Sequence, residues 1–564
     1  MRRQNSYGVF PNARTARRVA MSLVAAMLLT LSGCLSGPNA TSGSASGIVV
    51  HTAAQIAQVQ TSAADYNTNV NGLITGQTLM HWIDNWPANR PPGITGRLII
   101  LQTGFASCTA YTAAGACQTA YTLPASANDG VGFAGLEYAA HDNKNIFTYS
   151  VGDSEWVMAR SDGVITTTSM VLDGPSMDAF LKKYNIDPTR DMIVFVMGQG
   201  SPGADMLIGR GWYMFRYWGA SHTHLAILDG GIGNTLNATG GYATFTSGAH
   251  TAGTGYFSAT SDTPPYSGIV SVRAIPVDNT DLQASLEEML NVARGVYTPP
   301  GGAFIWDARS PNEFNGVSDQ TTGQTSCVTA AGGPCYVAFE GHIHGAVNLN
   351  FINLLWGNDF YNGPGSSADP YANNSFGNQN SYDTSAGTPL PGDLNGDGVV
   401  NGKDASYGYL DQAWLQKLIT DPLGTTETPP NGVTVHAIGY VPGELIYTHC
   451  RTTYRAMITG IAAGVVLGYP VKFYDAAWVE WGELGFAQNM SGAYNLPADS
   501  PWRTDVATDD LTYNSPSVVE VPPAISPYAA TGNAIISADK AYKTGSGGGP
   551  SSSGGGTPPA NPCG

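Results

Sequence analysis

One cysteine of this 564-residue chain lies in a setting that suits sulfur chemistry. Cys450 follows a short β-rich run, Glu444–Thr448, and opens a turn, Cys450–Arg455, that leads into a helix-like sequence. A cysteine at such a strand end faces unpaired backbone N–H groups and the positive end of the helix dipole, and both favour thiolate over thiol. Arg451 and Arg455 add positive charge around the same sulfur.

A thiolate surrounded by N–H donors can attack a sulfane sulfur and hold it as a persulfide. The same donors would bind an anionic leaving group such as sulfite. The persulfide sulfur would then pass to a second nucleophile, cyanide or a thiol. The alternative is a buried, inert cysteine, which two arginines within five residues fit badly. We therefore predict Cys450 as the catalytic nucleophile.

Four segments in this part of the chain share their order with one enzyme family. The segments are Phe304–Gly316, Glu340–Leu349, Tyr447–Ala456 and Tyr474–Trp481. Together they resemble the rhodanese (thiosulfate sulfurtransferase) family, with its D-x-R-x-x-x-E-[FY] segment, G-H-I-x-G-A-x-N segment, cysteine loop and Y-D-G-x-W end. The resemblance covers about Val270–Leu484 well and Leu73–Leu236 weakly, as the first domain of the tandem enzymes.

The resemblance implies a role for each matching residue. The turn would bind the substrate through Arg451, Thr452, Thr453, Tyr454 and Arg455, and the supporting residues would be Asp307, Arg309, Glu313 and His342. We expect Asp307 and Arg309 to brace the fold, Glu313 to pair with Arg309 or Arg455, and His342 and His449 to be structural, because a thiolate in this setting needs no base.

The chain departs from the family at three of these positions. Thr453 stands where the family commonly has glycine. Animal members have an arginine in place of Glu313 and a lysine or another small residue in place of Thr452. Two positive charges that help to bind thiosulfate are therefore absent, and anion binding rests on Arg451, Arg455 and the backbone.

Two halves of the chain share a strand–turn–helix–strand pattern. Met192–Met197 and Glu444–Thr448 read as buried strands, and each is followed by a turn and a helix that ends in Trp218-Gly219 or Leu467-Gly468. Buried parallel strands are typical of continuous apolar runs. The sequence thus predicts an α/β fold of two tandem rhodanese-like domains, each with a mostly parallel sheet flanked by helices. Ser201 stands where the first half would need a cysteine, so that half is expected to be catalytically silent.

Composition shifts suggest where the segments begin and end. We expect a signal peptide over 1–33, an anchor and linker over 34–69, a non-catalytic domain over 70–250, a catalytic domain over 265–490 with an insertion over 351–436, a C-terminal extension over 491–544 and a disordered Gly/Ser/Pro tail over 545–564.

The loop-rich insertion contains a pattern of oxygen ligands. The predicted calcium ligands are Asp393, Asn395, Asp397, Val399 (through its carbonyl), Asn401 and Asp404. Their spacing, around the tight turn at Gly398, is that of an EF-hand loop and resembles the dockerin version. The alternative is a solvated Asn/Gly loop. We expect a structural Ca²⁺, a following helix over Ala405–Leu418, and no organic cofactor.

The N-terminus predicts export. Five arginines precede an apolar run, Val19–Leu31, that is too short for a membrane span. The run ends in Leu31-Ser-Gly-Cys34, which resembles the lipobox of bacterial lipoproteins, although an ordinary signal peptide with a chance cysteine is the alternative. Lipidated Cys34 would hold the protein to a membrane of the bacterial cell envelope, on a periplasmic or cell-surface face, by its lipid only.

Export changes the interpretation of the remaining cysteines. Cys108 with Cys117, and Cys327 with Cys335, form close pairs in Gly/Ala/Thr-rich stretches, which indicate disulfides outside the cytoplasm. Metal binding is the alternative, but the further ligands that it needs are missing nearby. Cys563 stays unassigned.

Composition excludes some partners. The chain has only 12% charged residues and a net charge of −17, which argues against nucleic acid. We predict a sulfurtransferase that moves sulfur from a small anionic donor, thiosulfate or a relative, to cyanide or a thiol through a persulfide on Cys450. The alternative is a non-catalytic envelope carrier that holds sulfur, selenium or a metal on Cys450.

Overall fold

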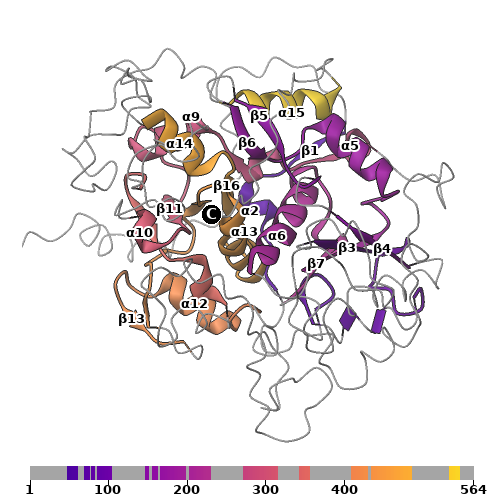
Figure 1. Cartoon of the computed structure of the whole chain (residues 1–564), viewed down its shortest axis with the longest axis horizontal. Helices are drawn as coiled ribbons and strands as arrows, with labels where there is room; N and C mark the ends of the chain where they lie inside the picture. The colour runs from indigo at the N-terminus through magenta and orange to yellow at the C-terminus, as the bar shows by residue number, and fades with distance from the viewer. Residues whose placement is uncertain are drawn as a thin grey trace, which may run out of the picture. The chain divides into compact units, whose positions relative to one another are not determined.

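Two five-stranded parallel sheets organise the chain in the computed structural model (Figure 1). The structure describes residues 47–60, 69–75, 78–79, 81–82, 86–103, 146–151, 155–162, 166–197, 202–229, 271–314, 342–355, 408–429, 434–485 and 533–545. All of these residues belong to one compact unit, Gly47–Gly564. Among them, none forms a helix long and apolar enough to span a membrane.

The first sheet has the strand order β2-β8-β7-β3-β4. Its strands are β2 (Gly72–Ile74), β3 (Leu98–Thr103), β4 (Ile146–Ser150), β7 (Met192–Met197) and β8 (Leu225–Leu228). The helices of this half are α5 (Gly174–Lys183) and α6 (Pro202–Tyr217). The central strands are buried runs of Leu, Ile, Val and Phe, as expected for parallel strands that are covered on both faces.

The second sheet has the order β10-β16-β15-β11-β12, which repeats the topology of the first strand for strand. Its strands are β10 (Gln283–Ala284), β11 (Ala303–Asp307), β12 (Ala346–Asn348), β15 (Leu445–His449) and β16 (Val471–Tyr474). The helices of this half are α9 (Leu286–Ala293), α10 (Pro311–Phe314), α13 (Tyr454–Ile461), continued by the π-helical turn η10 (Ala462–Val466), and α14 (Ala477–Gly485).

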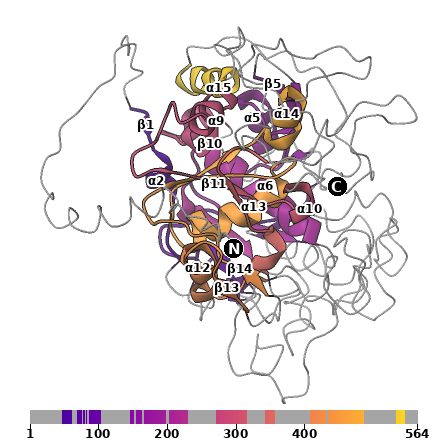
Figure 2. The same ribbon diagram turned by 90° about the vertical axis from the view of Figure 1, so that its left-hand side faces the viewer.

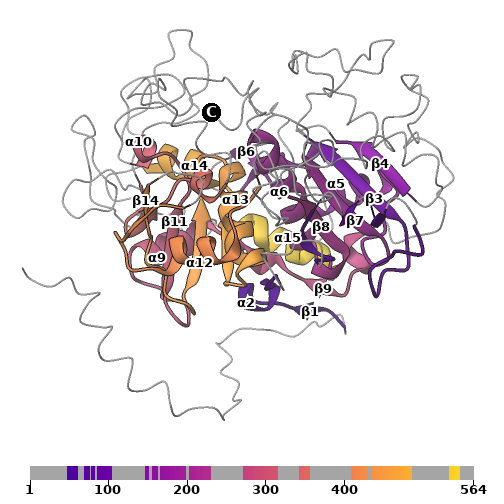
Figure 3. The same ribbon diagram turned by 90° about the horizontal axis from the view of Figure 1, so that it is seen from below.

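Helices α6 and α13 pack against each other between the two sheets (Figures 1 and 3). They follow the equivalent strands β7 and β15. A Cβ atom placed on Gly209 of α6 would lie 2.4 Å from the Cβ of Met457 on α13. The glycine is therefore what permits the close approach of these two helices.

Further elements complete the fold. They are β1 (Val49–Val50), α2 (Ala53–Ile56), β5 (Met158–Ser161), β6 (Thr166–Met170), η3 (His222–His224), η4 (Val272–Ala274), β9 (Val277–Asp278), η5 (Thr280–Leu282), η6 (Phe351–Leu354), α12 (Gln412–Thr420), β13 (Thr426–Glu427), β14 (Val435–His436) and α15 (Ala534–Thr544). Figure 2 shows α15, near the C-terminus, beside α5.

The α/β class and the paired strand–helix units predicted from the sequence are confirmed. Strand β7 has the predicted bounds, and β15 lies one residue later than predicted. The division into two tandem domains stays a prediction, because the two sheets share one compact unit. In the insertion, α12 begins at Gln412, and it buries Leu415 and Leu418 in the core, so this part is packed rather than loop-rich.

Candidate functional site

Cys450 lies directly after β15, at the carboxyl edge of the second sheet. It is fully buried, and it is the one cysteine among the described residues, where it forms no disulfide. The turn is fixed to the start of α14, because Trp478 N donates to Cys450 O at 3.0 Å and Val479 N donates to Arg451 O at 3.0 Å. Helix α13 begins at Tyr454, so its first N–H groups have no partners within the helix.

Thr453 closes this turn in the left-handed conformation, with φ = 64°. A β-branched residue is strained there, whereas the glycine that we noted as usual at this position is not. The Thr453 hydroxyl contacts two carbonyl oxygens, Tyr474 O at 2.7 Å and Asp475 O at 3.0 Å. Donation to these oxygens ties the turn to the end of β16 and compensates for part of the strain.

Both arginines of the turn converge on one carboxylate. Arg451 Nη2 lies 2.8 Å from Glu313 Oε1, and Arg455 places Nη1 2.6 Å from Oε2 and Nη2 2.8 Å from Oε1. All three side chains are buried. Burial alone would raise the pKa of Glu313, but the guanidiniums of Arg455 and Arg451 outweigh it and hold the pKa well below its usual value.

A second ion pair lies beside the first. Asp307, the last residue of β11, accepts from Arg309 Nη2 at 2.6 Å, and the Arg309 guanidinium lies 4.1 Å from the ring centre of Trp478. Burial opposes ionisation of Asp307, but Arg309 overcomes it and lowers the pKa of the carboxyl. Asn348 fixes the connecting backbone by donating to the carbonyls of Asp307 and Arg309 at 3.0 and 2.8 Å.

The two histidines near the site are neutral. Burial lowers the pKa of His449, which pairs in register with Asp307 and has its Nε2 3.9 Å from Asp307 Oδ2. Burial also lowers the pKa of His342 to about 4. His342 stacks on Phe314 with ring centres 3.8 Å apart, and its Nδ1 lies 2.9 Å from Phe314 O. Neither ring is charged at neutral pH, so neither adds a cation to the site.

The three buried arginines of this region are each bound to a carboxylate. Arg309 binds Asp307, and both Arg451 and Arg455 bind Glu313. Arg451 is also the neighbour of Cys450 in the chain, so a fixed guanidinium adjoins the cysteine in sequence.

Several predicted residues lie outside the described part of the chain. They are Ser201, the lipidation residue Cys34, the disulfide candidates Cys108, Cys117, Cys327 and Cys335, and the calcium ligands Asp393, Asn395, Asp397, Val399, Asn401 and Asp404. Within the described ranges, no group of His, Cys, Asp and Glu side chains could hold a metal ion. Thr452 is described, and it is buried in the turn.

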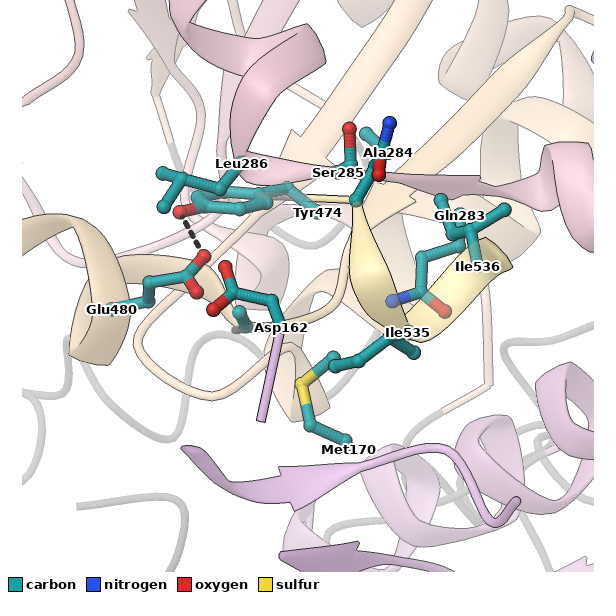
Figure 4. A pocket seen from close by; sticks show the side chains of 12 residues that line it. Asp162, Met170, Gln283, Ala284, Ser285, Leu286, Tyr474, Glu480, Ile535 and Ile536 are labelled. Atoms are coloured by element: carbon teal, nitrogen blue, oxygen red, sulfur yellow. Dashed lines mark hydrogen bonds between the residues drawn. The ribbon is translucent and has the colours of Figure 1, made fainter. Parts of the chain in front are cut away.

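A small pocket lies elsewhere, between β10, the end of β16 and α15 (Figure 4). Asp162, Tyr474 and Glu480 supply its polar wall, and Tyr474 donates to Glu480 Oε2 at 2.6 Å. Its cavity volume of about 10 Å³ is roughly what a single water needs. Cys450 does not line it, so Cys450 and this pocket are separate features.

The sequence motifs missed one residue that reaches the site. Arg210 of α6 is fully buried and pairs with Asp475, in the segment after β16. It also lies over the ring of Tyr454, 5.4 Å from the ring centre. A lone arginine inside the apolar run Met206–Phe215 is the signal that could have found it, because a buried cation requires a partner.

Comparison with known proteins gives limited guidance. No family model matches the chain, and no curated protein matches it in sequence. Similar solved structures include YnjE, the Tum1 protein from Saccharomyces cerevisiae, and the anaerobic ergothioneine biosynthesis enzyme from Chlorobium limicola in complex with trimethyl histidine.

The three likenesses are distant. YnjE is 16% identical with a TM-score of 0.36, over 73% of this chain and 66% of its own, just under two thirds of its length. Tum1 is 14% identical with a TM-score of 0.39, over 73% and 95%. The ergothioneine enzyme is 12% identical with a TM-score of 0.39, over 75% and 70%.

These results correct the family assignment that the motifs predicted. Membership of the rhodanese family, as a tandem-domain lipoprotein with a dockerin-like calcium loop, is wrong as stated, because no family model matches any part of the chain. The four short segments cover strands β11, β12 and β15 and the end of β16, with parts of the turns that follow, whereas a family model is compared over a much longer stretch of sequence.

Proposed function

We propose that this protein transfers sulfane sulfur through a persulfide on Cys450. The Cys450 thiolate attacks the outer sulfur of a donor, the donor's S–S bond breaks, and its electron pair leaves with the donor thiolate. The new S–S bond is on Cys450. An acceptor, cyanide or a thiolate, then takes the outer sulfur and returns the electron pair to Cys450, so that no external oxidant or reductant is needed.

One observation carries this proposal: Cys450 lies between the end of β15 and the start of α13, beside two buried arginines. Both arginines are bound to Glu313, which fixes them in the turn. The N–H groups of a helix start can bind an anion, and the persulfide is an anion.

The pairing of the two arginines bears on the donor. Thiosulfate carries two negative charges, but the guanidiniums of the turn already bind the carboxylate of Glu313, with which a dianion would have to compete. We therefore expect a low-molecular-weight persulfide, with at most one charge on its sulfane end, to be a better donor than thiosulfate.

A second candidate function is a carrier that loads sulfur on Cys450 without turnover. The observation that favours it is the burial of the Cys450 side chain, which is fully enclosed. An enclosed persulfide would be protected from acceptors. Stoichiometric loading that persists in the presence of cyanide would identify the carrier.

The experiment compares two donors that contain an S–S bond, glutathione persulfide and thiosulfate. Thiocyanate release after addition of cyanide measures turnover. We expect turnover with the persulfide, less with thiosulfate, and none from Cys450→Ser. Cys563→Ser, in the Gly/Ser/Pro-rich C-terminal tail, is the matched control and should keep the wild-type rate. Full turnover by Cys450→Ser would overturn the proposal.

A further inference from the structure

We propose that Arg210, on α6 in the first half of the chain, is a positioning residue for the Cys450 turn. This inference rests on the proposed function, since it assigns to the first half a part in shaping the reactive cysteine. Arg210 acts through Asp475 and Tyr454.

The first contact of Arg210 is a buried ion pair. Arg210 Nη1 binds Asp475 Oδ1, and both side chains have zero exposed area. The other Asp475 oxygen, Oδ2, accepts from Val171 N at 2.7 Å, while Arg210 Nη2 donates to Ser169 O at 3.0 Å. Groups from the first half of the chain thus bind both carboxylate oxygens of Asp475 and fix the orientation of its side chain.

Asp475 in turn holds the cysteine turn. Its backbone carbonyl accepts from the Thr453 hydroxyl at 3.0 Å, beside the carbonyl of Tyr474. Thr453 is the strained, left-handed residue of the turn, so its conformation persists only while its surroundings impose it. Fixing Asp475 therefore contributes to fixing Thr453.

The second contact of Arg210 is with the residue that opens α13. The guanidinium lies 5.4 Å from the ring centre of Tyr454, within the range of a cation–π interaction. Arg210 thus reaches two consecutive residues, Thr453 through Asp475 and Tyr454 directly. Their backbone N–H groups belong to the helix start that follows Cys450. A displaced turn would change the position of these donors relative to Cys450.

The test measures the Cys450 thiolate independently of sulfur transfer. Alkylation by iodoacetamide is followed against pH, with mass spectrometry of the Cys450 peptide separating it from the other cysteines. For Arg210→Gln we expect the midpoint of the curve to move to higher pH and the rate at pH 7 to fall at least about tenfold. Arg210→Lys, which keeps the charge, should give a smaller change.

Arg160→Gln is the matched control. Arg160 forms a similar buried ion pair with Asp539, 2.7 Å apart. It also donates to Val171 O at 3.3 Å, but it shares neither of the contacts by which Arg210 reaches the turn, the Asp475 carboxylate and the Tyr454 ring. Arg160→Gln should lower the melting temperature as Arg210→Gln does, but it should leave the midpoint of the alkylation curve unchanged. The double variant Arg210→Met/Asp475→Leu removes the lone buried charge and should regain stability while keeping the shifted curve.

The outcomes separate the two proposals. An Arg210→Gln curve that coincides with wild type, or a shift of the same size in Arg160→Gln, would overturn the positioning role. A double variant with the wild-type alkylation curve would also overturn the positioning role. The shift in Arg210→Gln would then come only from the uncompensated charge of Asp475. A shifted curve in a protein that transfers no sulfur would leave the positioning role intact and refute the proposed function.

Discussion

Glu313 is the residue that both arginines of the Cys450 turn bind. Its carboxylate pairs with Arg451 and Arg455, and none of the three side chains is more than 2% exposed. Glu313→Gln would remove the charged partner from two buried ion pairs, and breaking a buried pair costs about 3–5 kcal/mol. We expect urea unfolding to show a loss of this size.

The control for Glu313 is a pair near the surface. Lys183 and Glu155 form an ion pair whose side chains are 50% and 27% exposed. Such pairs contribute about 0–1 kcal/mol. Glu155→Gln should therefore change the free energy of unfolding little, and an equal effect of the two substitutions would show that Glu313 does not hold the cluster together.

Asp229, just after β8, gives a pH-dependent prediction. Burial, with help from Asp411, raises its pKa from 3.8 to about 7, although its carboxylate accepts from Tyr409 N. A pKa raised by folding means that the stabilising contribution is present below pH 3.8 and is lost as the pH rises through 7. Asp229→Asn keeps the acceptor without the charge. Its unfolding free energy should exceed the wild-type value by about 3–5 kcal/mol at pH 8, and the difference should vanish near pH 3.5. A difference of the same size at both pH values would contradict this.

Among the residues of the site, Cys450 could be predicted from the sequence. It could be singled out because the strand, turn and helix that define its setting are consecutive in the chain. Its long-range partners could not, since Glu313 lies 138 residues from Arg451 and Arg210 lies 265 from Asp475. Nothing local distinguishes these partners from other charged residues, and only the packing of distant elements brings them together.

At the scale of elements, the cysteine turn depends on a threonine hydroxyl. Thr453→Val keeps the shape but loses both contacts with the carbonyls of Tyr474 and Asp475, which leaves buried acceptors with less hydrogen bonding. We expect about 1–3 kcal/mol of destabilisation by urea unfolding. Thr453→Ser keeps the hydroxyl and should lose less than Thr453→Val. Equal losses in the two variants would mean that the hydroxyl does not hold the turn.

The elements themselves follow their sequence patterns to different degrees. Strand β7 coincides with the apolar run that predicted it, and α6 ends at Tyr217, just before the predicted helix end at Trp218-Gly219. Helix α12 begins later than the calcium-loop pattern predicted, at Gln412, because Tyr409 just before it is held in a β-bridge with Leu355 and donates its N–H to Asp229. This pairing with distant segments, which the local motif does not reveal, keeps the preceding residues out of the helix.

For the whole molecule, α15 connects distant parts of the chain. Asp539 accepts from both Arg160 terminal nitrogens, at 2.7 and 2.8 Å, and from Tyr217 OH at 2.6 Å. Lys543 Nζ donates to the carbonyls of Trp218 and Val272 at 2.8 and 2.6 Å. The sequence predicted only an extension over 491–544, because an amphipathic helix does not reveal which distant surface it covers.

Asp539→Asn tests this connection. The change removes the anion from a buried Arg160, so we expect about 3–5 kcal/mol of destabilisation in urea, with sulfur transfer per folded molecule unchanged. Lys540→Ala, on the exposed face of the same helix, should change stability by no more than about 0.5 kcal/mol. Similar losses in both variants would contradict a stabilising role of the buried pair.

The most direct measurement is the mass of the Cys450 peptide after incubation with glutathione persulfide. The account predicts a gain of one sulfur atom on Cys450, and loss of that mass, with release of thiocyanate, when cyanide is added. An unmodified Cys450 peptide after incubation with every donor, in protein whose folding is verified, would contradict sulfur transfer at this site.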